Sequence, residues 1–185
     1  MPKFKAILAS TLILTACQSP SFIDAVGGSP EEQLANAELQ MNQYSNDPRA
    51  EMLAIHSVDR ALKTYKEQNN LIGLGNAYHN QGKVYKVFER EAGVQKAEQS
   101  QNTAISYYNQ AKYNPGLAVA YGELMQLQYI KHNNQQACAS GTIAIQKFEA
   151  GKTTHPEITI PVYAKNTKDF GQFVENMKKQ IGCAN

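Results

Sequence analysis

The chain has 185 residues, with 18 Lys and Arg against 16 Asp and Glu, so it is nearly neutral at pH 7. This balance excludes the dense positive surface on which nucleic-acid binding and polybasic membrane association depend. The length suffices for one domain with a hydrophobic core.

Residues 1–16 have the pattern of a secretory signal. Lys3 and Lys5 flank the start of an apolar run from Phe4 to Leu14, and small residues follow it. The run is too short for a permanent membrane span, which needs about 20 apolar residues. Removing this segment also removes the two lysines, which leaves equal numbers of basic and acidic residues.

The sequence Leu14-Thr15-Ala16-Cys17 resembles the lipobox of bacterial lipoproteins. The resemblance implies cleavage before Cys17 and acylation of this residue on its sulfur and its new amine, which anchors the protein to a membrane. Gln18 follows, where Asp is the usual signal for inner membrane retention. The expected location is therefore the outer membrane, with the body facing the periplasm or, alternatively, the cell surface. The other interpretation is an ordinary secretory signal with a chance cysteine.

The rest of the chain divides into three parts by composition. Residues 17–29 contain the lipidated cysteine and a Gly- and Ser-containing stretch without helical period, which predicts a flexible tether. Residues 30–150 form the predicted helical domain. Residues 151–185 are expected to form an extended segment followed by a C-terminal capping helix.

Helix-start signals recur through the domain. Ser29-Pro30-Glu31-Glu32 has the pattern of a capping box with proline in the first turn, and Asp47-Pro48 and Asn114-Pro115 repeat the cap-then-proline arrangement. Strand signals are few before residue 150. The sequence therefore predicts an all-α fold with helices at 30–45, 48–69, 71–91, 95–113, 115–132 and 134–150.

Apolar residues at helical spacing predict the core. Three stripes are expected to be buried: Met52, Ile55, Leu62 and Tyr65; Leu74, Tyr78, Tyr85 and Phe88; and Leu117, Tyr121, Leu124 and Gln128. Residues 151–166 contain two prolines and alternating Ile158, Ile160 and Val162, so they are expected to be extended or to include one short strand. Thr167 is expected to cap a last helix ending at Gly182, with one apolar face formed by Phe170, Phe173, Val174, Met177 and Ile181.

Residues 120–144 resemble one tetratricopeptide repeat (TPR). Tyr121, Leu124, Ala137 and Ala144 match its pattern, whereas Met125 and Gln128 depart from it. A second first helix is indicated by Tyr78, Gly82 and Tyr85. Tyr78 and Tyr121 are 43 positions apart, as are Ala61 and Ala104, which favours an internal repeat. The resemblance implies antiparallel helical hairpins stacked as a short solenoid, and an unrelated helical bundle is the alternative.

A solenoid of this kind has a concave face formed by the first helix of each hairpin. The repeat pattern places seven polar or aromatic residues on this face. Such side chains can hydrogen-bond a peptide backbone and hold a carboxylate, although a solvated helix surface would have the same composition. The predicted peptide-groove residues are Asn76, His79, Lys83, Lys86, Glu123, Gln126 and Tyr129.

Two cysteines remain after Cys17 is assigned to acylation. Cys138 lies at the start of a predicted helix and Cys183 directly follows the last one. In an oxidising periplasm an even pair favours a disulfide, with a free reactive thiol as the alternative.

No catalytic, cofactor or metal motif is recognisable. The four histidines have no partner at a metal-binding spacing, and the signatures of serine hydrolases, zinc proteases and nucleotide-binding loops are missing from the sequence. We therefore expect no enzyme and no cofactor. The expected function is binding of another periplasmic or envelope protein, as an assembly, docking or secretion/pilus accessory factor. The alternatives are a lipoprotein that binds cell-wall peptidoglycan or a small ligand, and an enzyme whose site has no sequence signature.

Overall fold

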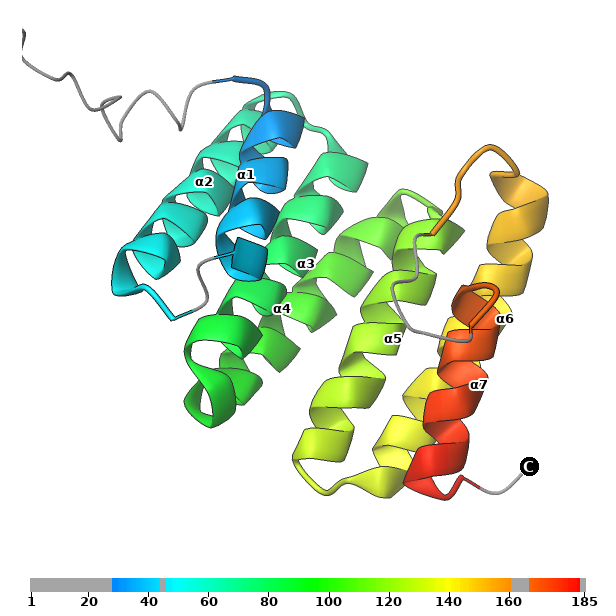
Figure 1. Ribbon diagram of the computed structural model, residues 1–185. Helices are drawn as coiled ribbons and strands as arrows, with labels where there is room; N and C mark the ends of the chain where they lie inside the picture. The colour runs from blue at the N-terminus through cyan, green and yellow to red at the C-terminus, as the bar shows by residue number, and fades with distance from the viewer. Residues whose placement is uncertain (1–27, 44–45, 161–166, 184–185) are drawn as a thin grey trace, which may run out of the picture.

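The computed structural model describes residues 28–43, 46–160 and 167–183, and within them the chain is helical without a strand (Figure 1). The all-α prediction is therefore confirmed. The helices are α1 (Pro30–Gln43), α2 (Pro48–Glu67), α3 (Leu71–Phe88), α4 (Arg90–Gln110), α5 (Asn114–Ile130), α6 (Asn134–Thr154) and α7 (Phe170–Ile181).

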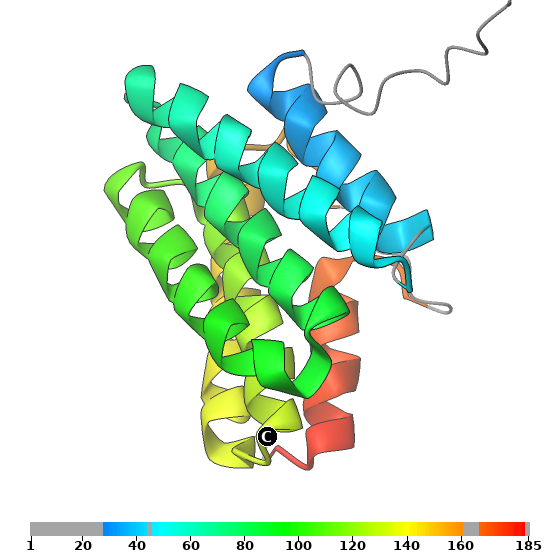
Figure 2. The same cartoon turned by 90° about the vertical axis from the view of Figure 1, so that its left-hand side faces the viewer.

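Neighbouring helices pack in pairs and the pairs stack side by side (Figures 1 and 2). The closest pairs are α1 with α2, α3 with α4 and α5 with α6, and α7 packs on α6. Contacts also join α1 to α3 and α3 to α5. The first helices of the three pairs thus form one layer, which is the arrangement expected of a helical repeat.

Two of the three caps predicted before residue 150 are confirmed. Ser29 N–H donates to the Glu32 carboxylate at 2.7 Å, and Glu32 N–H donates to Ser29 Oγ at 3.2 Å, which completes the capping box. Asp47 accepts from the backbone amide of Arg49 and caps α2. The prediction for Asn114 is wrong, because this residue is already inside α5 and its side chain donates to Thr154 Oγ1.

The predicted start of the fourth helix at residue 95 is also wrong. The helix α4 begins at Arg90, and Glu89 alone separates it from α3. Gly93 makes this close junction possible, because a side chain there would overlap the Tyr85 carbonyl oxygen. The sequence interpretation treated this glycine as part of a longer loop.

The segment after residue 150 differs from the prediction as well. Helix α6 continues to Thr154, and residues 155–160 contain no strand. Of the alternating residues, Ile160 packs against the core, Ile158 is exposed, and Val162 lies outside the described residues. Asp169, and not Thr167, caps α7 by accepting from the Gln172 backbone amide at 2.9 Å.

A repeated joint connects the helical pairs. Tyr65 near the end of α2 lies against Gly73 at the start of α3, and Tyr108 near the end of α4 lies against Gly116 at the start of α5. Both tyrosines are 2% exposed. Each tyrosine carbonyl accepts a backbone hydrogen bond at 2.9 Å, from Asn70 and Tyr113 respectively. Corresponding residues of the two joints are 43 positions apart, so the same set of contacts recurs at this spacing.

The core of α2 follows a different stripe from the predicted one. Met52 is 63% exposed, and Ile55 and Leu62 are only partly buried. The buried face consists of Ala54, Val58, Ala61 and Tyr65. Small side chains such as Ala54 and Ala61 allow α2 to approach both α1 and α3 closely. The buried face of α2 is therefore the one that contains them, and not the one with the larger apolar side chains.

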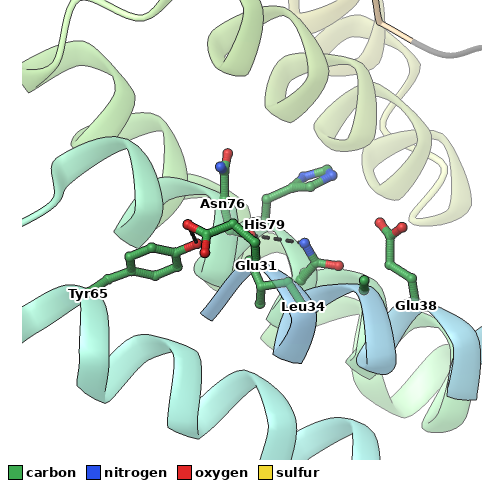
Figure 3. Close-up of a pocket in the computed structure, with 8 residues that line it drawn as sticks. Glu31, Leu34, Glu38, Tyr65, Asn76 and His79 are labelled. Carbon is green, nitrogen blue, oxygen red and sulfur yellow. Dashed lines mark hydrogen bonds between the residues drawn. The ribbon is translucent and has the colours of Figure 1, made fainter. Parts of the chain in front are cut away.

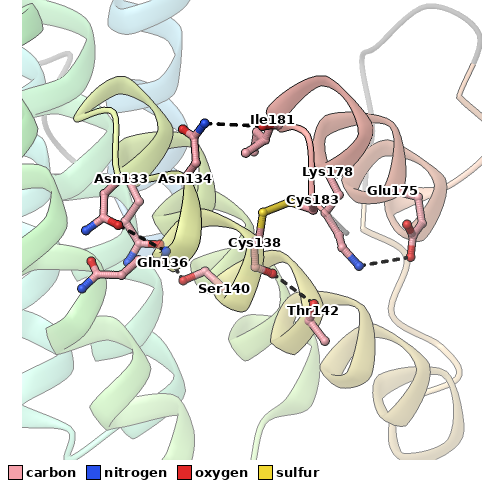
Figure 4. Close-up of a disulfide and its surroundings, with 11 residues drawn as sticks. Asn133, Asn134, Gln136, Cys138, Ser140, Thr142, Glu175, Lys178, Ile181 and Cys183 are labelled. Atoms are coloured by element: carbon pink, nitrogen blue, oxygen red, sulfur yellow. Dashed lines mark hydrogen bonds and ion pairs between the residues drawn. A yellow bond between two sulfur atoms is a disulfide. The ribbon is translucent and has the colours of Figure 1, made fainter. Parts of the chain in front are cut away.

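Helix α7 closes the end of the stack opposite α1 (Figure 1), and its disulfide to α6 is shown in Figure 4. Phe170, Val174 and Ile181 are buried against α5 and α6, and Phe173 and Met177 pack around them, so its predicted apolar face is confirmed. A disulfide joins Cys138 to Cys183, whose Cα atoms are 5.5 Å apart. The predicted pairing of these two cysteines is thus present in the structure.

The Tyr–Gly joint predicts opposite effects of alanine at two helical glycines. Gly73→Ala places a methyl group in the Tyr65 ring and should destabilise the protein by about 1–3 kcal/mol. Gly151→Ala meets no atom closer than 3.5 Å, so the better helix propensity should stabilise it by up to about 1 kcal/mol. Urea unfolding followed by circular dichroism measures both. Equal changes in the free energy of unfolding at the two positions would contradict the close contact between Tyr65 and Gly73.

The disulfide predicts a large loss of stability on its removal. It encloses 45 residues, for which the chain-entropy relation gives about 4 kcal/mol. The double variant Cys138→Ala, Cys183→Ala should therefore unfold at a lower urea concentration than the oxidised protein. Dithiothreitol should destabilise the original protein and leave the variant unchanged. The same midpoint for the oxidised protein and the variant would show that the bond does not constrain the chain.

Candidate functional site

An open cleft of about 290 Å³ lies between α1 and α3, and Tyr65 of α2 also lines it (Figure 3). Two helical faces line it, because residues three, four and seven positions apart share one side of a helix. One face comes from α1 and the other from α3. The lining residues are Glu31, Leu34, Ala35, Glu38, Tyr65, Asn76, His79 and Asn80.

The buried tyrosines of the repeated joint extend their hydroxyl groups to cleft residues. Tyr65 donates to Glu31 Oε1 at 2.8 Å, as Figure 3 shows, and Tyr108 donates to Asn76 Oδ1 at 2.7 Å. Hydrogen bonds from its own backbone amide and from the Tyr65 hydroxyl lower the pKa of Glu31. Its carboxyl group is therefore ionised at neutral pH, and the hydroxyl of the buried Tyr65 orients it although Glu31 itself is exposed.

Gln101 of α4 fixes which ring nitrogen of His79 carries the proton. Gln101 Nε2 donates to the His79 carbonyl at 3.1 Å, so the other atom of the amide, Oε1, faces His79 Nδ1 at 3.0 Å. Because Oε1 can only accept, Nδ1 must carry a proton. Burial lowers the pKa of His79, opposed in part by Glu123 and Gln101. The imidazole is thus neutral at pH 7, and its Nε2 atom is an acceptor.

Two ion pairs connect the three first helices. Lys83 of α3 contacts Glu38 of α1 at 2.6 Å, and Lys86 of α3 contacts Glu123 of α5 at 2.5 Å. Burial by itself raises the pKa of Glu123, but the neighbouring positive charges, that of Lys86 foremost, outweigh it and lower the pKa. Both lysines therefore have carboxylate partners within the protein, so holding a carboxylate of a bound peptide would require breaking these pairs.

The predicted groove residues fall into three groups. Asn76 and His79 line the cleft, with Lys83 beside it, and Lys86 and Glu123 form the next ion pair along the layer. Gln126 and Tyr129 are 43 positions after Lys83 and Lys86, so they occupy the equivalent places on α5. They do not line the cleft, and Tyr129 is 41% exposed.

Sequence reasoning missed the α1 side of the cleft. Glu31 and Glu38 are seven positions apart and hence on one helical face, which was a usable signal. The repeat signals in the sequence begin at Ala61, so they did not assign α1 to the layer of first helices. No feature of the sequence marks Asn80 as a cleft residue, because its burial depends on how α3 packs against its neighbours.

The described part of the chain contains no cluster of three or more His, Cys, Asp or Glu residues that could hold a metal ion. None of its helices is long and apolar enough to cross a membrane. The chain matches no protein-family model, no curated protein and no solved structure. The geometry of the cleft and its surrounding layer therefore carries the functional argument.

The environment of His79 predicts a pH-dependent stability. Because its folded pKa lies below the ordinary 6.5, the unfolded chain binds a proton first as the pH falls. The stabilisation is complete above pH 6.5 and is lost as the pH falls through the folded pKa. Glu123 does not contribute in this window, because its lowered pKa makes it titrate below 4.5.

The measurement is urea unfolding between pH 7 and 5. The unmodified protein should lose stability over this range with a slope of at most about 1.4 kcal/mol per pH unit, and His79→Gln should lose less. His56→Gln, at an exposed position on α2, is the matched control and should keep the original slope. The same slope in His79→Gln and the original protein would contradict the assignment.

Proposed function

We propose that the protein is an outer membrane-anchored lipoprotein that binds a segment of another periplasmic or envelope protein, as an assembly, docking or secretion/pilus accessory factor. One observation carries this proposal. Partly buried polar side chains of α1, α3 and α5 lie in a single layer, and this layer contains an open cleft between α1 and α3. Polar groups at regular helical spacing are suited to reading the backbone and side chains of an extended segment.

Membrane anchoring supplies the other half of the proposal. It rests on the sequence Leu14–Cys17, which lies outside the described residues. A lipid that recruits the protein to the membrane and a surface that binds a client there would act together, because confinement raises the effective concentration of the two partners. The tetratricopeptide resemblance supports the same function, since such stacks bind through their first helices.

The alternative is binding of peptidoglycan or a small ligand. Sugar-binding surfaces present exposed flat aromatic rings. Among the large apolar side chains that are exposed in the described residues, Tyr129 is the only aromatic one. The polar character of the first-helix layer therefore favours a protein client.

Site-specific crosslinking in cells tests the proposal. A photoreactive phenylalanine derivative replaces Tyr129, whose ring it resembles, and in a second strain it replaces Met52. Both positions are exposed, but Tyr129 belongs to α5 in the first-helix layer and Met52 to α2 in the other layer. We expect a discrete envelope protein to be captured from position 129 at least about tenfold more than from position 52.

Anchoring is tested in the same cells. Cys17→Ser should leave an unprocessed precursor or release the protein into soluble fractions, and capture from position 129 should fall. Equal capture from both positions, or attachment of cell-wall fragments in place of a protein, would refute the proposed client surface. Normal outer membrane fractionation of the Cys17→Ser variant would refute the lipid anchor.

A further inference from the structure

The cleft between α1 and α3 contains a buried acceptor that the protein leaves unpaired. Asn80 is 7% exposed and lines the cleft, and its Nδ2 atom donates to the Asn76 carbonyl at 3.1 Å. Only a donor can face that carbonyl oxygen, so the orientation of the amide is fixed and the other atom must be Oδ1. No group in the described residues donates to Asn80 Oδ1. Leaving a buried acceptor without a donor is unfavourable, so a donor that reached Asn80 from the cleft would gain a hydrogen bond there.

Most other polar groups of the cleft are also acceptors. Asn76 is the exception, because Tyr108 donates to its Oδ1 atom and its Nδ2 group remains a donor. The fixed position of Gln101 leaves His79 with an acceptor at Nε2, and Glu31 and Glu38 contribute carboxylates. Lys83 balances the charge of Glu38, whereas Glu31 is held by the neutral Tyr65 hydroxyl and has no cationic partner among the described residues. The cleft therefore has one uncompensated negative charge and an excess of acceptors.

The remaining lining is apolar and small. Leu34 and Ala35 of α1 lie between the two glutamates in the sequence and complete the wall of the cleft. Small-molecule sites span roughly 300–1,000 Å³, and the cleft volume of about 290 Å³ is at the lower limit of this range. The cleft therefore suits a single side chain better than a larger ligand. A long cationic side chain fits this combination, because its hydrocarbon stem packs on apolar residues while its charged end donates hydrogen bonds.

We propose that the cleft binds an arginine or lysine side chain of the client segment. This inference rests on the proposed client-binding function and adds the chemistry that the client must present: a positive charge with several N–H donors at the end of a flexible stem. It reverses the polarity expected from the sequence, in which Lys83 and Lys86 were to hold a carboxylate. Both lysines already neutralise glutamates of the protein.

The first test is calorimetric titration of the full-length protein with N-acetyl-arginine methylamide and N-acetyl-lysine methylamide. N-acetyl-citrulline methylamide has nearly the shape of the arginine probe without its charge and is the control ligand. We expect both cationic probes to bind at least about fivefold more tightly than citrulline. Equal binding of arginine and citrulline probes, or binding of neither cationic probe, would overturn the proposal.

Two protein variants locate the binding. Glu31→Gln removes the uncompensated charge and keeps an acceptor for Tyr65, and should weaken the cationic probes at least about fivefold. Glu32→Gln is the matched control, because it removes a charge one residue away, outside the cleft lining, and glutamine can also close the capping box. Equal weakening by the two variants would mean that the probes respond to the general charge of α1 and would overturn the proposed site. Thermal unfolding confirms that both variants are folded.

Crosslinking from position 129 distinguishes a client side chain from a free amine. If the cleft holds a side chain of the client, Glu31→Gln should lower capture at least about fivefold together with probe binding. Unchanged capture by Glu31→Gln, with probe binding lost, would assign the cleft to a free small amine and overturn the client assignment. Probe binding without any capture from position 129 would count against the proposed client surface and leave the acceptor chemistry of the cleft established.

Discussion

Tyr65 and Tyr108 each lie across the backbone of the following helix, where glycine leaves room for the ring. The rings occupy the space that side chains at Gly73 and Gly116 would need, so the distance between successive helical pairs depends on those two glycines. The hydroxyl groups then emerge on the far side of the joint and bond to Glu31 and Asn76. The tyrosine–glycine contact, made once at each of the two junctions, thereby sets the stacking of the pairs and positions two polar residues of the cleft.

The polar layer of first helices is stable because its charges are paired within it. Lys83 joins α3 to α1 and Lys86 joins α3 to α5, and all four side chains of these pairs are at least half-buried. A single surface ion pair contributes only about 0–1 kcal/mol, but partial burial reduces screening and makes a mismatched charge unfavourable. The pairs therefore define which first helices are neighbours. They also leave Glu31 as the carboxylate of the cleft without a cation.

Local sequence signals predicted those features that depend on adjacent residues. Spacing along one helix predicts the capping box at Ser29, the apolar face of α7 and the all-α fold. The Cys138–Cys183 bond follows from the even number of remaining cysteines and from their positions. Features that depend on which helix packs beside which were missed. Met52 was expected to be buried because it is apolar, yet α2 uses alanines where α1 and α3 approach it.

The candidate site was only half predictable for the same reason. Asn76 and His79 followed from the repeat pattern on α3, whereas Glu31 and Glu38 became visible only once α1 was seen to pack beside α3. The unpaired Oδ1 of Asn80 is a consequence of three-dimensional burial, because the same asparagine on an exposed face would bond to water.

The two ends of the stack differ in how firmly they are held. At one end, α7 is buried against α5 and α6 and is joined covalently to α6. At the other, α1 depends on noncovalent contacts with α2 and α3, including the Tyr65–Glu31 hydrogen bond and the Lys83–Glu38 ion pair. Local opening is easiest where such contacts are fewest. Because α1 supplies half of the cleft, its detachment would abolish the site, and a ligand in the cleft would in turn stabilise α1 by binding only the closed form. Occupancy of the cleft and docking of α1 are therefore thermodynamically coupled, at the end of the domain that follows the predicted membrane tether.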